Sequence, residues 1–192
     1  VMMARAGAKV ILVARDQEKL AAALEEVKSG DGQAWAYSCD ISDMEACDRL
    51  IDRIIEDHRV IDILVNNAGR SIRRSIALSY DRFHDFERTM QLNYFGSLRL
   101  IMRVLPGMTA RRSGHVINIS SIGVLSNSPR FSAYVASKAA LDAFSWCAAS
   151  EFADSNVRFT TVNMPLVRTP MIAPTKLYDA FPALSPDEAA EL

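Results

Sequence analysis

The sequence is poor in the residues that build disulfide scaffolds and metal sites. Its 192 residues include three cysteines and three histidines. Cys39, Cys47 and Cys147 are an odd number without the spacing of metal ligands, and the histidines are scattered. We therefore expect reduced thiols in a cytoplasmic protein and no metal ion.

Long apolar runs and an excess of charge of one sign are also absent. No stretch approaches the roughly 20 apolar residues of a membrane span, and the opening residues lack the order of a signal peptide. The formal net charge is −1, which disfavours nucleic-acid binding. With 49% hydrophobic residues, the chain can form one domain with a core of its own.

Short runs of apolar residues alternate with helical patterns. The runs at 10–14, 34–38, 61–65, 115–119 and 157–163 suit strands buried on both faces. Helical spacing separates them, most clearly at 81–111 and 133–153. This alternation predicts parallel strands joined by right-handed crossovers, which is a doubly wound, Rossmann-like α/β sheet in a three-layer α/β/α arrangement.

The first and last segments read as parts of longer elements. Residues 1–6 match the end of a helix that turns at Gly7, and residues 185–192 match the start of one. In a doubly wound fold, the first helix should follow a strand and a glycine-rich phosphate loop, and both are missing. We expect residues 1–192 to form a single NAD(P)-binding domain, truncated at both ends.

One helical turn separates Tyr134 from Lys138, so phenol and ammonium should project from the same face. A cation beside a phenol favours the phenolate and lowers the phenol's pKa from about 10. The Ser121 hydroxyl could hold a carbonyl oxygen next to that phenol. Together these groups predict a proton donor aimed at an oxygen that gains negative charge.

Polar clusters follow all five predicted strands, at the edge where ligands bind in such a sheet. They are Arg15 and Asp16, Asp40 and Ile41, Asn66 to Gly69, Ser120 and Ser121, and Asn163 to Thr169. Arg15 suits the 2′-phosphate of NADP, whereas an NAD site usually carries an acidic residue there. Asp16 is acidic and, with a shift of one residue, could bind the ribose, so NAD stays an alternative cofactor. Residues 66–69 could also form an ordinary turn.

Four motifs together resemble those of the short-chain dehydrogenase/reductase family. They are Asn66 to Gly69, Asn93 in 92–96, Ser121 in 118–121, and Tyr134 with Lys138. The resemblance implies that Tyr134 is the general acid and that Lys138 lowers its pKa and holds the nicotinamide ribose. It also implies that Ser121 orients the substrate carbonyl and that Asn93 supports a water-mediated proton relay.

The resemblance also implies where NADPH binds. Asp40 and Ile41 would flank the adenine, Asn67, Ala68 and Gly69 would line the adenosine side, and Pro165, Val167 and Thr169 would lie near the carboxamide. The family commonly has glycine after this proline. Leu166 stands there instead, so we expect the loop to follow a different path beside a more lipophilic pocket.

The runs 69–74, 80–96, 128–134 and 164–176 are similar to the short-chain reductase domain of bacterial fatty acyl-CoA reductases. This implies NADPH-dependent reduction of long-chain acyl-CoA to fatty aldehyde. Arg70, Arg73 and Arg74 would bind the phosphates of coenzyme A, or would form a solvated basic loop paired with nearby acids. Leu166, Met171 and Ile172 would line the acyl pocket.

The same catalytic groups would serve a ketone, an aldehyde or a secondary alcohol, so a general oxidoreductase stays open. A cofactor-sensing regulator is disfavoured because it needs no proton donor. The helices at about 87–110 and 133–153 carry extra apolar residues, which predict two buried faces. The resemblance implies a homodimer or homotetramer, and burial within one subunit is the alternative.

Overall fold

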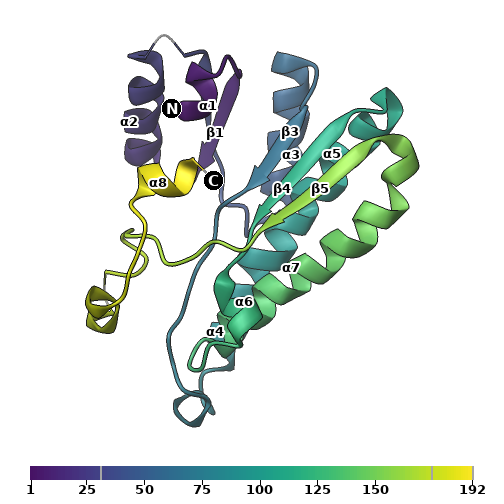
Figure 1. Cartoon of the computed structure of the whole chain (residues 1–192). Helices are drawn as coiled ribbons and strands as arrows, with labels where there is room; N and C mark the ends of the chain where they lie inside the picture. The colour runs from purple at the N-terminus through teal and green to yellow at the C-terminus, as the bar shows by residue number, and fades with distance from the viewer. Residues whose placement is uncertain (31, 174, 192) are drawn as a thin grey trace.

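The computed structural model describes residues 1–30, 32–173 and 175–191, and five strands alternate with helices along them (Figure 1). The strands are β1 (Val10–Ala14), β2 (Ala34–Ser38), β3 (Ile63–Asn66), β4 (Gly114–Ile119) and β5 (Val157–Val162). The longer helices are α2 (Gln17–Lys28), α3 (Met44–His58), α4 (Phe83–Met90), α5 (Ser97–Arg111) and α7 (Ser132–Glu151). Short helices are α1 (Met2–Arg5), α6 (Ile122–Ser126), α8 (Pro186–Ala190) and the 3₁₀ turns η1 (Ile76–Leu78), η3 (Ala153–Ser155) and η4 (Lys176–Ala180).

All strand pairs are parallel, as the alternation predicts. β1 pairs with β2 from Val10 opposite Ala34 onward, and β4 lies between β3 and β5. In the described residues the strands form a two-stranded and a three-stranded sheet, which agrees with the expectation that the first strand of the doubly wound sheet is missing. No described strand lies between β1 and β3 to join their free edges.

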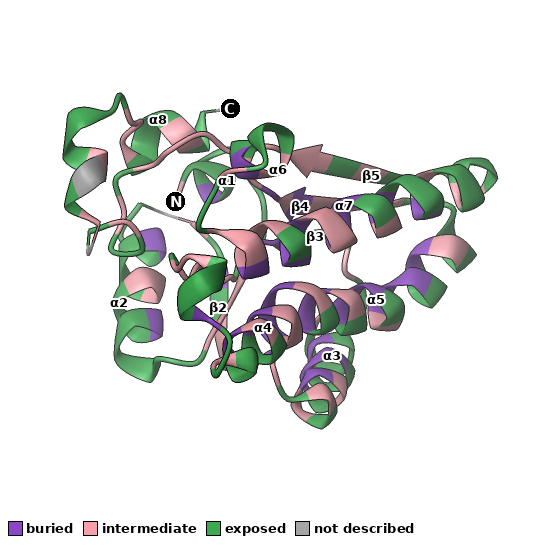
Figure 2. Cartoon of the chain, turned by 90° about the horizontal axis from the view of Figure 1, so that it is seen from below, coloured by how far each residue is buried: buried purple, intermediate pink, exposed green. Residues whose placement is uncertain are grey.

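Helices α5 and α7 pack on the three-stranded sheet, α3 packs on α5, and the buried residues of all three helices belong to one core (Figure 2). Ile51 of α3, Ile101 and Met108 of α5, and Leu141 of α7 are at most 2% exposed. Each such side chain contributes about 1.5–3 kcal/mol by leaving water. Among the described residues, no helix is long and apolar enough to cross a membrane.

The pattern at 81–111 folds as α4 and α5 joined by a π-helical segment, η2 (Gln91–Gly96), rather than as one uniform α-helix. The wider turn contains Asn93, and such turns often occur at functional sites. Gly96 is required by packing, because a Cβ atom there would lie 2.3 Å from the carbonyl oxygen of Ile41. The segment therefore sits directly against the end of the β2 region.

Candidate active site

The end of β4 and the first half of α7 bring the predicted catalytic residues together. Ser121 follows β4 and caps α6 by accepting the Gly123 N–H at 3.1 Å. Tyr134 and Lys138 lie on α7, and the Lys138 ammonium donates to the Ile119 carbonyl oxygen at 2.7 Å. The three residues predicted from spacing thus converge at one strand end.

Lys138 is a buried cation, only 4% exposed. Burial lowers the pKa of its ammonium to about 8, and the nearby Asp142 carboxylate opposes this shift. Among residues 1–30, 32–173 and 175–191, no hydrogen-bond acceptor other than Ile119 is within reach of the ammonium. Its remaining N–H groups are therefore available to ligand hydroxyls.

The predicted lowering of the Tyr134 pKa is wrong in this structure. Burial raises the pKa of the phenol above its ordinary value, and the Asp142 carboxylate and the Tyr178 phenol add to the rise. Ser121 opposes the shift as a nearby hydroxyl, although its contact with the phenol is looser than a full hydrogen bond, as is common in unliganded sites. Lys138 is not among the groups that shift the Tyr134 pKa, and its ammonium donates to the Ile119 carbonyl.

Asn93 is completely buried and locks the loop after β3 onto α7. Its amide oxygen accepts the Arg70 N–H at 2.8 Å, and its amide nitrogen donates to the Arg70 carbonyl at 2.8 Å and to Ser137 Oγ at 2.9 Å. A Cβ atom at Gly69 would lie 3.5 Å from Lys138 Nζ. Asn93 therefore holds Gly69 over Lys138, while its role in a proton relay stays a prediction.

Buried amides tie the strands to α7 beneath this site. Asn66 donates to Asn118 Oδ1 at 2.8 Å, and Asn118 donates to Ser145 Oγ at 2.7 Å. Asn66, the last residue of β3, thus binds the neighbouring strand β4. This network links β3, β4 and α7 and so fixes the strand ends relative to Lys138.

At the ends of β1 and β2, Arg15 and Asp40 form an ion pair of 3.3 Å. Burial would raise the pKa of Asp40, but hydrogen bonds from Ser42 and from Arg15 outweigh it and lower that pKa. Asp16 caps α2 by accepting the Lys19 N–H at 3.1 Å. Its carboxylate is thus engaged in the helix cap, whereas the Arg15 side chain is 55% exposed.

These strand ends fit a dinucleotide. Ile41 follows β2 and Asn67 to Gly69 follow β3, at the strand ends where the adenosine is expected, and Arg15 offers a cation at the far corner. On the nicotinamide side, the buried Lys138 ammonium has further N–H groups that could bind a ligand. Gly69 has no side chain, so a ligand can approach its backbone closely. The contacts of Asp40, Ile41, Asn67 and Ala68 with a cofactor stay predictions.

The segment after β5 is held in an extended path over the site. Leu184 donates its N–H to the Leu166 carbonyl at 2.9 Å, and its own carbonyl accepts the Arg168 N–H at 2.9 Å. Val167 thereby forms a bridge with Leu184. The segment carries Pro165 and Thr169, and Met171 beyond it is 49% exposed while Leu166 and Ile172 are half-buried.

Sequence reasoning missed an aromatic cluster at Tyr134. The ring of Phe131 lies edge-to-face with Tyr134 at 6.5 Å and stacks on Tyr178 of η4 at 6.4 Å. This brings the segment after β5 to the proton donor. Phe131 lies in the run 128–134 that carries part of the family resemblance, yet no spacing rule connects it to a residue 47 positions later in the sequence.

The three candidate phosphate-binding arginines differ in their surroundings. Arg74 lies 3.4 Å from the buried carboxylate of Asp85, which also pairs with Arg82 at 3.1 Å and with Arg88. This matches the alternative of ion pairing for Arg74. Arg73 is exposed and lowers the pKa of Tyr178 against the effect of burial, so its charge faces the aromatic cluster.

The model of the family described as short chain dehydrogenase matches residues 1–178. The chain belongs to the short-chain dehydrogenase family. Curated relatives include a fatty acyl-CoA reductase of Acinetobacter baylyi, 57% identical over 99% of this chain, and one of Mycobacterium tuberculosis, 52% identical over 96%. The chain covers 64% and 63% of these two relatives.

Solved structures agree with this family. A short-chain dehydrogenase from Streptomyces avermitilis has a TM-score of 0.85 and 30% identity, with 97% of this chain and 74% of that one covered. A metagenomic short-chain oxidoreductase in complex with NADP has a TM-score of 0.83 and 28% identity, with 98% and 78% covered. The predicted α/β class and family resemblance are confirmed.

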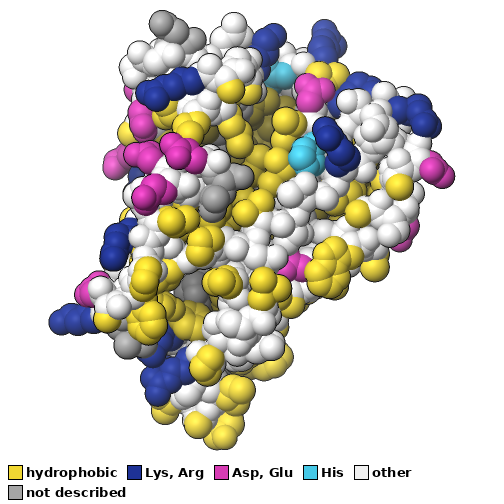
Figure 3. All heavy atoms as spheres, in the orientation of Figure 1, with side chains coloured by type: hydrophobic (Ala, Val, Ile, Leu, Met, Phe, Trp, Pro, Cys, Tyr) yellow, Lys and Arg dark blue, Asp and Glu magenta, His cyan; other side chains and the backbone are white. Residues whose placement is uncertain are grey.

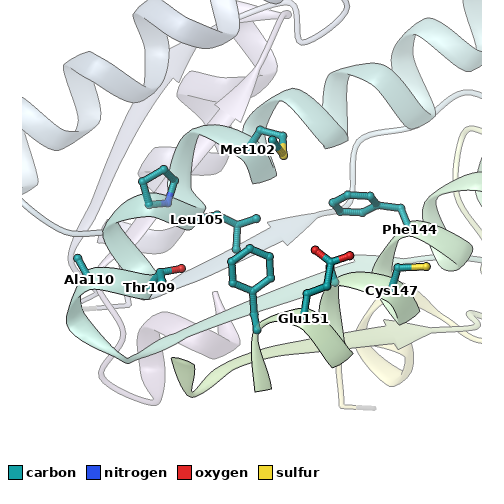
Figure 4. A pocket seen from close by; sticks show the side chains of 10 residues that line it. Met102, Leu105, Thr109, Ala110, Phe144, Cys147 and Glu151 are labelled. Carbon is teal, nitrogen blue, oxygen red and sulfur yellow. The ribbon is translucent and has the colours of Figure 1, made fainter. Parts of the chain in front are cut away.

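A large hollow of this short-chain dehydrogenase lies away from these residues. It measures about 680 Å³ and opens between α5 and α7, with Met102, Leu105, Phe144 and Cys147 in its wall (Figure 4). None of the predicted catalytic residues lines it. The candidate active site at the strand ends is therefore separate from this hollow.

Proposed function

We propose that the chain is the reductase domain of an NADPH-dependent enzyme that reduces the thioester carbonyl of long-chain acyl-CoA to the aldehyde. The observation that supports it most is the meeting of Ser121, Tyr134 and Lys138 at the end of β4. A reductase needs a protonated donor, and the raised pKa of Tyr134 keeps its proton in place at neutral pH.

A bound reduced nicotinamide would supply the hydride, which adds to the carbonyl carbon of the thioester. Ser121 and Tyr134 would hold the carbonyl oxygen as it gains negative charge, and Tyr134 would give it a proton. The resulting hemithioacetal then loses the thiol of coenzyme A and leaves the aldehyde. Lys138 would bind ribose hydroxyls with the N–H groups that Ile119 leaves free.

The preference for NADPH rests on the corner after β1. Asp16, the acidic residue that could bind a ribose 2′-hydroxyl, caps α2 instead. The half-exposed Arg15 guanidinium is held by Asp40 beside the same corner and suits a 2′-phosphate. One solved relative is described as bound to NADP.

The loop after β3 supports an amphiphilic substrate. It begins with Arg70 and Arg73, and four large apolar side chains follow that are 62–84% exposed: Ile76, Leu78, Tyr80 and Phe83. Hydrophobic atoms gather at the lower end of the molecule, where this loop lies (Figure 3). Positive charge next to exposed apolar surface matches a phosphate-bearing head group joined to an acyl chain. Leu166, Met171 and Ile172 would add to the lipophilic wall.

A homodimer or homotetramer would use the outer stripes of α5 and α7. Met102 is 54% exposed and lines the hollow of Figure 4, and Trp146 on α7 is 68% exposed. Large apolar side chains that no described element covers are typical of an interface between subunits. These two side chains are not buried within one subunit, so the alternative does not apply to them.

The test is NADPH oxidation by the full-length protein with long-chain acyl-CoA, the matching fatty aldehyde and a simple ketone in parallel. We expect acyl-CoA to be consumed with release of free thiol in equal amount. Turnover of the ketone alone would contradict acyl-CoA reduction and favour a general carbonyl reductase, which the same catalytic groups permit.

A further inference from the structure

Three consecutive residues at the end of β4 each engage one residue of a single stripe on α7. Ser121 lies beside Tyr134, the Ile119 carbonyl binds Lys138, and Ser120 Oγ donates to Asp142 Oδ2 at 2.8 Å. Tyr134, Lys138 and Asp142 are spaced by four residues, so they form one line along the helix. Asp142 is the member of this line to which the reaction above assigns no role.

Burial of the Asp142 carboxylate is unfavourable in free energy. Asp142 is 3% exposed, and within the described part of the chain its Oδ1 atom has no hydrogen-bond partner. A buried carboxylate with an unsatisfied oxygen costs free energy that an apolar residue would avoid. Asp142 lies one helical turn from the buried ammonium of Lys138 without forming a direct ion pair with it.

We propose that Asp142 is a positioning residue that acts through Lys138: its negative charge, one turn deeper in α7, keeps the buried ammonium charged and in place. This inference rests on the proposed reductase function, in which Lys138 must be a cation. The Ser120 hydroxyl in turn holds the Asp142 carboxylate at the strand end.

The groups around Lys138 leave Asp142 as its source of compensating charge. On α7 itself the neighbours one turn away are Tyr134 and Asp142. β4 and η2 contribute the Ile119 carbonyl and the Asn93 amide, which are uncharged. From η4 comes the Tyr178 phenol, and on α4 the Asp85 carboxylate is neutralised by Arg74, Arg82 and Arg88. In agreement, the Asp142 carboxylate raises the pKa of Lys138 against the lowering by burial.

The test is Asp142→Asn, which keeps the shape and removes the charge. Without that charge, Lys138 should lose its proton at lower pH, with a shift of about one pH unit for a tenfold change in its protonation constant. The expected kcat/KM is within about twofold of wild type at pH 6 and about tenfold lower at pH 9. Asp142→Glu, which restores the charge, should recover most of the loss at pH 9.

A second measurement needs no substrate. The free energy of unfolding should begin its rise with pH about one unit earlier in Asp142→Asn than in wild type, because that rise reports deprotonation of Lys138. Ser145→Ala is the matched control: it removes an equally buried hydrogen bond of α7 and should lower stability at every pH without moving the rise.

Unchanged pH dependence in both measurements would overturn the proposal, and so would a shift of equal size in Ser145→Ala. If Asp142→Asn does not fold, Asp142→Ser removes the same charge from a smaller volume and must give the same shift. A protein that turns over no carbonyl substrate would contradict the reductase function, while the unfolding measurement would still decide whether Asp142 supports the charge of Lys138.

Discussion

The buried ammonium of Lys138 makes a prediction that can be tested without a substrate. Its pKa is about 8 in the folded protein against 10.5 for an ordinary lysine. Below pH 8 both states carry the proton, and the fold bears the cost of burying the charge. Between these two values the unfolded chain binds more protons than the folded one, so stability rises with pH. A difference of 2.5 pH units corresponds to about 3 kcal/mol.

Lys138→Met isolates this contribution. Other groups oppose the rise in wild type, since burial raises the pKa of Cys47 from 9.0 and that of Tyr37 from 10.0 to about 12, and both lower stability at high pH. These effects cancel when variant and wild type are compared at the same pH. Relative to wild type, Lys138→Met should lose about 3 kcal/mol of stability between pH 7 and pH 10.5.

Urea unfolding followed by circular dichroism at several pH values between 7 and 10.5 measures this difference. Lys19→Met is the control, because it removes a lysine whose side chain is 85% exposed rather than buried. A flat difference for Lys138→Met would show that the folded-state pKa of Lys138 is close to its ordinary value, and the account of a desolvated cation would then be refuted.

Three further substitutions test the site and its surroundings. Tyr134→Phe removes one hydroxyl and should lower kcat by at least about a hundredfold while cofactor binding, measured by NADPH fluorescence, survives; retained turnover would contradict the proton donor. Arg15→Ala should weaken NADPH binding about tenfold or more with little effect on NADH, and equal losses in titrations of both would refute the 2′-phosphate contact. Asp85→Asn leaves Arg74 and its two neighbouring arginines facing each other, so it should lower the free energy of unfolding by roughly 2 kcal/mol; an unchanged urea midpoint would show that solvent already screens these charges.

The sequence was sufficient for the fold class and for the meeting of Ser121, Tyr134 and Lys138. Branched apolar runs marked the strands closely, for example Val10–Ala14, although each residue of this strand is only half-buried in the described part of the chain. The four-residue spacing placed phenol and amine on one face, because helix geometry is local. These signals require no knowledge of which elements pack together.

Other features depend on tertiary packing and left no sequence signal. The upward shift of the Tyr134 pKa follows from burial of the phenol. The Lys138 ammonium binds the Ile119 carbonyl of β4, and both features depend on how α7 packs on this strand. Asp142 carries no sequence signal of its own, because its hydrogen bond with Ser120 joins residues that are far apart in the chain. The pairing of Arg74 with Asp85 could be named only as one alternative, because charged loops offer many partners of similar energy.

The raised pKa of Tyr134 bears on the direction of the reaction. Reduction starts from a protonated phenol and ends when the proton moves to a substrate oxyanion, which is a far stronger base than a phenolate. Oxidation of an alcohol requires the phenolate first, and every pKa unit above the ambient pH adds about 1.4 kcal/mol to that requirement. Burial, which raises the Tyr134 pKa, disfavours the phenolate, and the Asp142 carboxylate and the Tyr178 phenol add to this rise. The raised pKa therefore keeps the Tyr134 phenol protonated before reduction begins, as the proposed proton donor requires.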